Sequence, residues 1–225
     1  LKNKFQFEIS IIDAFDNYPL PQKFAGVGFA RKIGFDLSLT FADSKTIFVA
    51  LDADTLISNN YFEILDKYFN SDGFNCLIPG IKHQKAENKI EEDAIRQYEK
   101  FLFSTANELR NAGSPYGFVT MGSAMAFTKS CYIKAGGMPR KKATEDFYFL
   151  QEIVKTSSVI TIPIKLVFPS SRISDRVYLG TGFRMLEASK GKNLSDLFYS
   201  NSSFKTLKKW LNIGQNGFSN SITDI

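Results

Sequence analysis

Two carboxylates separated by a single residue follow a hydrophobic run in this chain. The run, Thr46–Leu51, reads TIFVAL, and Asp52 and Asp54 come directly after it. An uninterrupted run rich in branched residues is typical of a strand covered on both faces, and open α/β sheets bind their ligands at the carboxyl ends of such strands. Two acids in this position therefore predict a site that holds a hard divalent cation through oxygen. The alternative is that both acids only cap a following helix at a solvent-exposed strand end.

A second acidic pair, Glu145 and Asp146, follows Thr144 at the start of a predicted helix. A positioned carboxylate can take a proton from a reacting hydroxyl as a general base. The alternative is a helix start in which Thr144 caps the first turn and the two acids interact with the positive end of the helix dipole.

The elements that must position these acids alternate along the sequence. Hydrophobic patterns predict strands at 5–14, 46–51, 74–81 and 118–127, with two short strands at 159–163 and 164–168. They predict helices at 28–40, 60–69, 91–112, 130–135 and 146–155, and one or two amphipathic helices within 194–213. This order predicts an α/β fold with a mainly parallel sheet flanked by helices. We expect one catalytic domain over residues 1–190 and a C-terminal helical appendage over 191–225.

Composition excludes several classes of protein. The chain has 225 residues, of which 44% are hydrophobic, so a substantial core is expected. The net charge of +5 suits an anionic ligand such as a nucleotide. The sequence has no basic stripe interleaved with aromatic residues, so nucleic-acid binding is not predicted. Cys76 and Cys131 lack metal-site spacing, so we expect two reduced, buried thiols. The single histidine, His83, is expected in a loop, which argues against a Ser-His-Asp mechanism.

No apolar run reaches the roughly 18 residues that a membrane span needs, so a cytoplasmic protein is expected. The segment Phe204–Ile213 reads FKTLKKWLNI and includes Trp210. It predicts a basic amphipathic helix. Such a helix either packs on the body of the protein or makes a peripheral contact with a membrane surface or a partner.

Several short motifs occur in an order that resembles glycosyltransferase family 2. They are GVGFARKIG at 26–34, MGSAMAF at 121–127, AGGM at 135–138 and TEDF at 144–147, and they follow or flank the LDADT of 51–55. The resemblance covers roughly residues 5–168, and Lys32 stands where the family pattern usually has Asn. It implies the GT-A fold, a Rossmann-like, mixed but mainly parallel sheet flanked by helices.

The resemblance also implies an activity. A sugar would pass with inversion from a nucleotide-diphosphate donor to a hydroxyl of a carbohydrate or glycoconjugate acceptor. Asp54 would bind Mn²⁺ or Mg²⁺, which offsets the charge of the leaving diphosphate, and Asp52 would share the metal or contact the ribose. Asp146 would be the base, and Glu145 would orient it or hold one of the sugars.

Further residues are expected to hold the donor. Arg31 presents a planar cation to phosphate or base, Gly122 and Ser123 let the backbone approach the sugar, and Arg172 or Arg176 closes over the diphosphate from a late loop. The alternatives are helix-surface and loop arginines and a glycine required only for packing.

The chain departs from the family pattern at its front. The strand of the form V-x-V-P-x-Y-N, with the helix and acidic strand that follow it, is not found before Phe5, so the domain is expected to be N-terminally incomplete. No Q-x-x-R-W motif is present, which favours transfer of single sugars.

Two other functions compete with the transferase. D-x-D-x-T also resembles the start of haloacid-dehalogenase-like phosphatases, with Asp52 as nucleophile. That interpretation is weaker, because the motif is not on the first strand and no late G-D-x-x-x-D follows. The third possibility is a non-catalytic sugar-nucleotide-binding relative.

Overall fold

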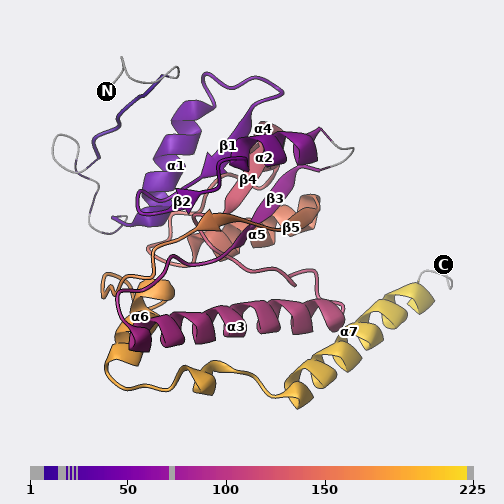
Figure 1. The fold of residues 1–225 in the computed structure, drawn as a ribbon. Coiled ribbons are helices and arrows are strands. Elements are labelled where there is room, and N and C mark those ends of the chain that lie inside the picture. Colours follow the sequence, from indigo (N-terminus) through magenta and orange to yellow (C-terminus); the bar gives the residue numbers. More distant parts are fainter. Residues whose placement is uncertain are drawn as a thin grey trace.

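A five-stranded sheet with helices on both faces forms the centre of the chain (Figure 1). The computed structural model describes residues 8–14, 19, 21, 23, 25–70 and 74–221. The strands are β1 (Ile47–Ala50), β2 (Leu56–Ile57), β3 (Cys76–Ile81), β4 (Met125–Thr128) and β5 (Val159–Phe168). The helices are α1 (Val27–Ser38), α2 (Tyr61–Phe69), α3 (Lys89–Asn111), α4 (Lys129–Lys134), α5 (Glu145–Thr156), α6 (Thr181–Ser189), the 3-10 helix η1 (Leu194–Leu197) and α7 (Asn201–Ser221).

The strand order is β1-β4-β3-β5-β2. Strand β4 is antiparallel to both β1 and β3, β5 is antiparallel to β2, and β3 and β5 are parallel. It follows that β1, β3 and β5 all run in one direction, with β4 inserted between β1 and β3 in the opposite one. The mixed α/β class is therefore confirmed, but the described residues do not form a mainly parallel sheet.

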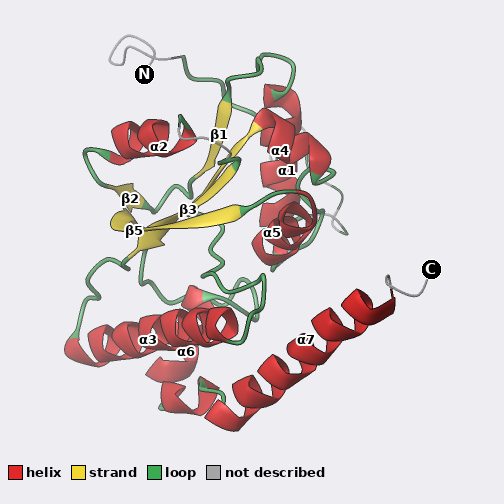
Figure 2. Cartoon of the chain, turned by 90° about the vertical axis from the view of Figure 1, so that its right-hand side faces the viewer, coloured by secondary structure: helices red, strands yellow, loops and turns green. Residues whose placement is uncertain are grey.

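Alternate residues of the central strands pack into two different hydrophobic cores, one on each face of the sheet. On β3, Cys76 and Ile78 belong to a core with Phe127, whereas Leu77 belongs to a second core with Ala126. This alternation is what a pleated strand covered on both faces requires. Figure 2 shows α2 on one side of the sheet and α1, α4 and α5 on the other, with α3 and α6 beneath.

Aromatic rings fix the helices of the first core against the sheet. The Phe127 ring lies 5.1 Å from that of Phe35 on α1, 5.7 Å from that of Tyr132 on α4 and 4.8 Å from that of Phe149 on α5, measured between centroids. The contacts with Phe35 and Phe149 are edge-to-face and the contact with Tyr132 is stacked, and both kinds add to the hydrophobic gain of burying the rings. One strand residue thus holds the helix that carries Arg31 and the helix that carries Glu145.

Most predicted helices are confirmed, and the largest errors concern strands. Residues 8–14 of the predicted first strand have no regular secondary structure, and residues 5–7 lie outside the described residues. The strand expected at 118–127 begins only at Met125, because residues 121–124 form a turn closed by a 3.0 Å hydrogen bond from Ala124 N to Met121 O. The two short strands expected at 159–168 are one strand, β5. Strand β2 and helix α6 were not predicted.

The two cysteines are free and buried, as expected. Although distant in sequence, their thiols hydrogen-bond each other, and this bond together with burial raises the pKa of the Cys76 thiol. Among the described residues, no helix combines the length and the apolar character needed to cross a bilayer.

Candidate functional site

One edge of the sheet gathers nearly all the residues singled out by the sequence. Strands β1, β3 and β5 end there, and β4 begins there. Asp52 and Asp54 follow β1, Gln84 follows β3, Arg172 follows β5, and Gly122 precedes β4. The topology therefore brings residues from four separate segments of the chain to one place.

The segment Asp52–Thr55 is a tight turn held at both ends. Thr55 N donates a 3.0 Å hydrogen bond to Asp52 O, and the chain then enters β2, which pairs with the end of β5. The Gln84 amide donates 2.8 Å hydrogen bonds to both Asp54 O and Phe168 O. The capping alternative is wrong for these acids, since α2 begins only at Tyr61, after Asn60. Gln84 was not predicted, although a polar residue after a strand is the signal that singled out Asp52.

Arg31 connects the two acidic motifs. Its guanidinium forms ion pairs with Asp52 through Nη2 and with Glu145 through Nη1. The exposed fractions of the side chains are 11% for Arg31, 43% for Asp52 and 4% for Glu145. A planar cation with several fixed donors suits a position between two carboxylates. The site is thus closed to solvent on the side of Glu145 and open to solvent on the side of Asp52.

Close packing of α1 sets the position of Arg31. A Cβ on Gly28 would lie 2.4 Å from Lys141 O and 2.8 Å from Glu145 Cβ, so only glycine fits at this point. The backbone of α1 therefore lies directly against the segment that leads into α5. Arg31, one turn later, then reaches Glu145.

The acidic pair at the start of α5 is held at elevated pKa values. Burial, and then the charge of Asp146, raises the pKa of Glu145 to about 7, although Arg31 acts to lower it. Burial likewise raises the pKa of Asp146 above its ordinary value, against a hydrogen bond from its own segment and the charge of Arg31. Buried carboxylates with raised pKa values are frequent at catalytic centres.

The residue before this pair has an unusual backbone. Thr144 has φ of 63°, and no other non-glycine residue among those described has a positive φ. The left-handed conformation costs a β-branched residue on the order of 1–3 kcal/mol. Thr144 is at the N-cap position, but its hydroxyl donates to Ala143 O and makes no cap bond. The alternative in which the Thr144 side chain caps the first turn is therefore wrong.

Of the late-loop arginines, one contacts the first motif. Arg172 Nε donates a 2.6 Å hydrogen bond to Asp54 Oδ2, and both side chains are more than one-third exposed. Arg176 Nε instead donates to Ser174 Oγ of its own loop at 3.3 Å. Within the part of the chain that the structure describes, Arg176 forms no ion pair with the acids of the site.

Gly122 and Ser123 lie in the turn before β4. A Cβ on Gly122 would lie 2.2 Å from Arg31 Nη1, and Ser123 beside it is buried. The absence of a side chain at Gly122 thus leaves room for the guanidinium. This is a different use of the glycine from the expected close approach of backbone to sugar.

A buried polar network supports the site from behind. His83 is 1% exposed, its Nδ1 lies 3.0 Å from Glu99 Oε1, and its Nε2 lies 3.0 Å from Thr181 Oγ1. Arg96 Nη1 donates to Glu99 Oε2 at 2.7 Å, and its Nη2 donates to the His83 carbonyl at 2.9 Å. His83 lies in a loop, as expected, but it fixes the segment of Gln84 to α3 and α6.

The site could accommodate a divalent cation only in part. No group of three or more His, Cys, Asp and Glu side chains among the described residues is arranged to hold a metal ion. Asp52 and Asp54 each keep a partly exposed carboxylate that is paired with an arginine. In this arrangement each acid is therefore paired with an arginine, and the described residues by themselves do not form a metal site.

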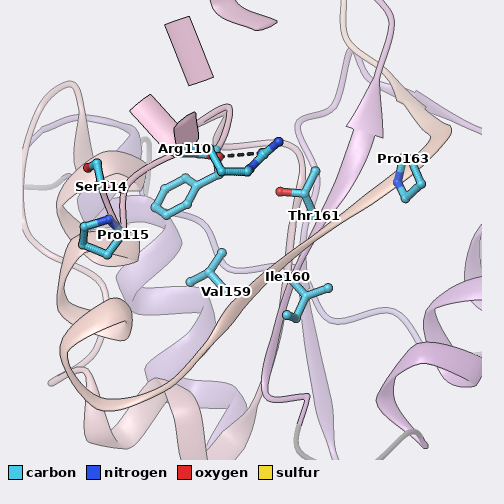
Figure 3. Close-up of a pocket in the computed structure, with 9 residues that line it drawn as sticks. Arg110, Ser114, Pro115, Val159, Ile160, Thr161 and Pro163 are labelled. Carbon is cyan, nitrogen blue, oxygen red and sulfur yellow. Dashed lines mark hydrogen bonds between the residues drawn. The ribbon is translucent and has the colours of Figure 1, made fainter. Parts of the chain in front are cut away.

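Two cavities lie outside this cluster. One, of about 410 Å³, is at the opposite end of β5, between Val159–Pro163 and the end of α3 (Figure 3). Its charged residue, Arg110, donates a 2.6 Å hydrogen bond to Gly117 O and so has a structural partner. The other, of about 380 Å³, lies between Lys32 and the Ala135–Lys141 segment. Neither contains the acidic motifs.

Of the predicted residues, the structure connects Arg31, Asp52 and Glu145 by ion pairs, and Arg172 and Asp54 by another. Comparison of the sequence with known protein families and with curated proteins finds no match.

Proposed function

We propose that this chain is a glycosyltransferase that moves a sugar, with inversion, from a nucleotide-diphosphate donor to an acceptor hydroxyl. The observation that carries the proposal is the ion-paired bridge of Asp52, Arg31 and Glu145. It joins the acids after β1 to the acidic pair of α5, although the two motifs are far apart in sequence. A transferase needs a leaving-group site and a base within reach of one sugar, and these two motifs would supply them.

The first motif would serve the leaving group. Asp52 and Asp54 would hold Mn²⁺ or Mg²⁺ together with diphosphate oxygens, and the metal would offset the negative charge that develops as the sugar bond breaks. Arg172 is exposed and pairs with Asp54, so it can turn to phosphate when a donor binds.

The second motif would serve the acceptor. Asp146 is the proposed base, because its pKa is raised and it is near the charges of Arg31 and Asp52. Glu145 is more firmly held, at 3% exposure and paired with Arg31, which suits an orienting role. A base is most effective when its pKa approaches the working pH.

The GT-A-like fold is part of the proposal. Strands β1, β3 and β5 share one direction, and their carboxyl ends coincide with the acidic site, as ligand sites in α/β sheets do. The antiparallel β4 is consistent with a mixed sheet of that kind.

The test is a panel of nucleotide-diphosphate sugars with Mn²⁺, in which release of the nucleoside diphosphate is measured. We expect release from one nucleotide class, and a loss on the order of 10²-fold or more in Asp54→Ala and Asp146→Asn. Asp66→Ala, which removes an exposed acid on α2, should leave the rate unchanged. Release of phosphate from simple monoesters with Asp52 phosphorylated would instead establish a phosphatase.

A further inference from the structure

Helix α7 has two chemically distinct sides. At about 100° per residue, one half of the circumference carries the large apolar residues of 201–216, which are Phe204, Leu207, Trp210, Leu211 and Ile213. The other half carries its lysines, which are Lys205, Lys208 and Lys209. No Asp or Glu occurs from 201 to 216. This part of the helix is therefore amphipathic and purely cationic.

The apolar side has little to pack against in the described chain. Figure 2 shows α7 diverging from α3 and α6, and in both views its second half projects beyond the rest of the described chain (Figures 1 and 2). Tyr199 just before the helix contacts Phe101 and Phe204, at ring-centroid distances of 6.2 and 6.1 Å. Further along, Trp210 is 68% exposed and Ile213 is 71% exposed. The alternative in which this helix packs on the body of the protein is therefore wrong for Trp210 and Ile213.

The distribution of charge on α7 indicates which kind of partner could cover its apolar side. A second copy of α7 packed through the apolar side would leave the lysines of both copies on the outer surfaces, with no anionic partner. An acidic protein would match the lysines but not the exposed apolar side that carries Trp210 and Ile213. An anionic lipid surface suits both, because lysines contact headgroups while tryptophan and aliphatic residues enter the boundary with the acyl chains.

We propose that α7 binds anionic lipid headgroups, lying along the membrane surface with Phe204, Trp210 and Ile213 in the interface. Around the helix, Lys208 then lies next to Phe204 and Lys209 next to Ile213, so these two lysines border the buried face and reach the headgroups. This inference is independent of the proposed transferase activity, since it uses no residue of the acidic site.

Trp210 makes the proposal directly measurable, because it is the only tryptophan of the chain. We expect its fluorescence to move to shorter wavelength when vesicles of mixed phosphatidylcholine and phosphatidylglycerol are added to the full chain. The shift should weaken with added salt, because counterions screen the lysines. Vesicles of phosphatidylcholine alone should give a much smaller shift.

Variants assign the binding to the two sides of α7. Combined Lys205→Gln, Lys208→Gln and Lys209→Gln should weaken vesicle binding about 100-fold, at a factor of several per lysine. The matched control combines Lys45→Gln, Lys100→Gln and Lys190→Gln, which remove three exposed lysines elsewhere, and should bind like the unaltered chain. Ile213→Ser should reduce both binding and the shift, with an unchanged urea unfolding midpoint.

Three results would overturn the proposal. One is no fluorescence shift with anionic vesicles, and another is equal binding of the neutral and anionic vesicles. The third is a concentration-dependent shift without vesicles, accompanied by dimer formation in sedimentation, which would show that a second copy covers the apolar side.

Discussion

At the scale of single residues, Glu145 is in an environment that opposes its charge. Burial first, and then Asp146, raises its pKa from 4.5 to about 7. A carboxyl group whose folded pKa is raised stabilises the fold fully only below its unfolded pKa, and that stability is lost as pH rises through the folded pKa. We therefore expect Glu145 to reduce the stability of the fold between about pH 4.5 and 7.

Glu145→Gln tests this expectation, because glutamine does not ionise. From pH 4.5 to about pH 8, the free energy of unfolding of the variant should rise relative to that of the unaltered chain by up to about 3 kcal/mol. Urea unfolding at both pH values measures this difference. Glu152→Gln on the exposed side of α5 should show no such dependence. If the difference in free energy of unfolding between Glu145→Gln and the unaltered chain does not change with pH, Glu145 does not have the raised pKa assigned to it.

Residue types at strand ends could be predicted from the sequence, but their partners could not. Asp52 and Asp54 were found because a polar pair interrupts a hydrophobic run, which is a local signal. The importance of Gln84 and His83 depends on Asp54, Phe168 and Glu99, which come from other segments. Contacts between such distant segments cannot be predicted from the hydrophobic periodicity of the sequence.

At the scale of elements, the approach of α1 to α5 decides whether Arg31 reaches Glu145. Gly28→Ala would force a Cβ against Lys141 O and Glu145, both closer than normal contact. We expect a loss of about 1–3 kcal/mol of stability from overpacking, together with weakened nucleotide binding as Arg31 is displaced.

Gly34→Ala provides the matched control on the same helix. Nothing lies within 4 Å of a Cβ at Gly34, so this change should stabilise the fold by about 1 kcal/mol through helix propensity. Urea unfolding and nucleotide titration of both variants test the pair. Equal effects of the two alanines would show that the close approach at Gly28 does not position the site.

The network that joins β3, α3 and α6 should govern acid stability. Burial acts to raise the pKa of Glu99, but hydrogen bonds from His83 and Arg96 outweigh it and lower that pKa from 4.5 to about 2. A lowered pKa gives stability that is present above about pH 4.5 and is lost as pH falls towards 2. Glu99→Gln should lose about 3 kcal/mol at neutral pH.

Acid unfolding compares the unaltered chain with Glu99→Gln and with Glu63→Gln, an exposed control on α2. In the unaltered chain, the free energy of unfolding should fall between pH 4.5 and 2 as Glu99 takes up a proton. This fall should be largely absent in the Glu99 variant and unchanged in the control. An unchanged acid profile in Glu99→Gln would rule out this role of the network.

Element types were predicted better than element directions. Strand β1 and helix α3 follow from hydrophobic patterns in 46–51 and 91–112. The direction of β4 does not, because it depends on how the long α3 returns the chain to the sheet. Strand β2 has two residues and exists only through its pairing with Phe168 and Val167, so its own sequence carries no signal.

At the scale of the whole molecule, the proposal requires the acidic edge of the sheet to act as one nucleotide site. Four segments contribute to it, and Arg31 and Arg172 offset part of the charge of the acids. A diphosphate with a divalent cation would add ligands and counter-charge at the exposed carboxylates of Asp52 and Asp54. Binding should therefore need the metal and these acids together.

Calorimetric titration of the chain with UDP, GDP and other nucleoside diphosphates, with and without Mn²⁺, tests this most directly. We predict binding of one nucleotide that requires Mn²⁺, is lost in Asp54→Ala and is retained in Asp66→Ala. Absence of binding to every nucleoside diphosphate, or binding that is indifferent to Mn²⁺ and to Asp54→Ala, would contradict a donor site at this edge of the sheet.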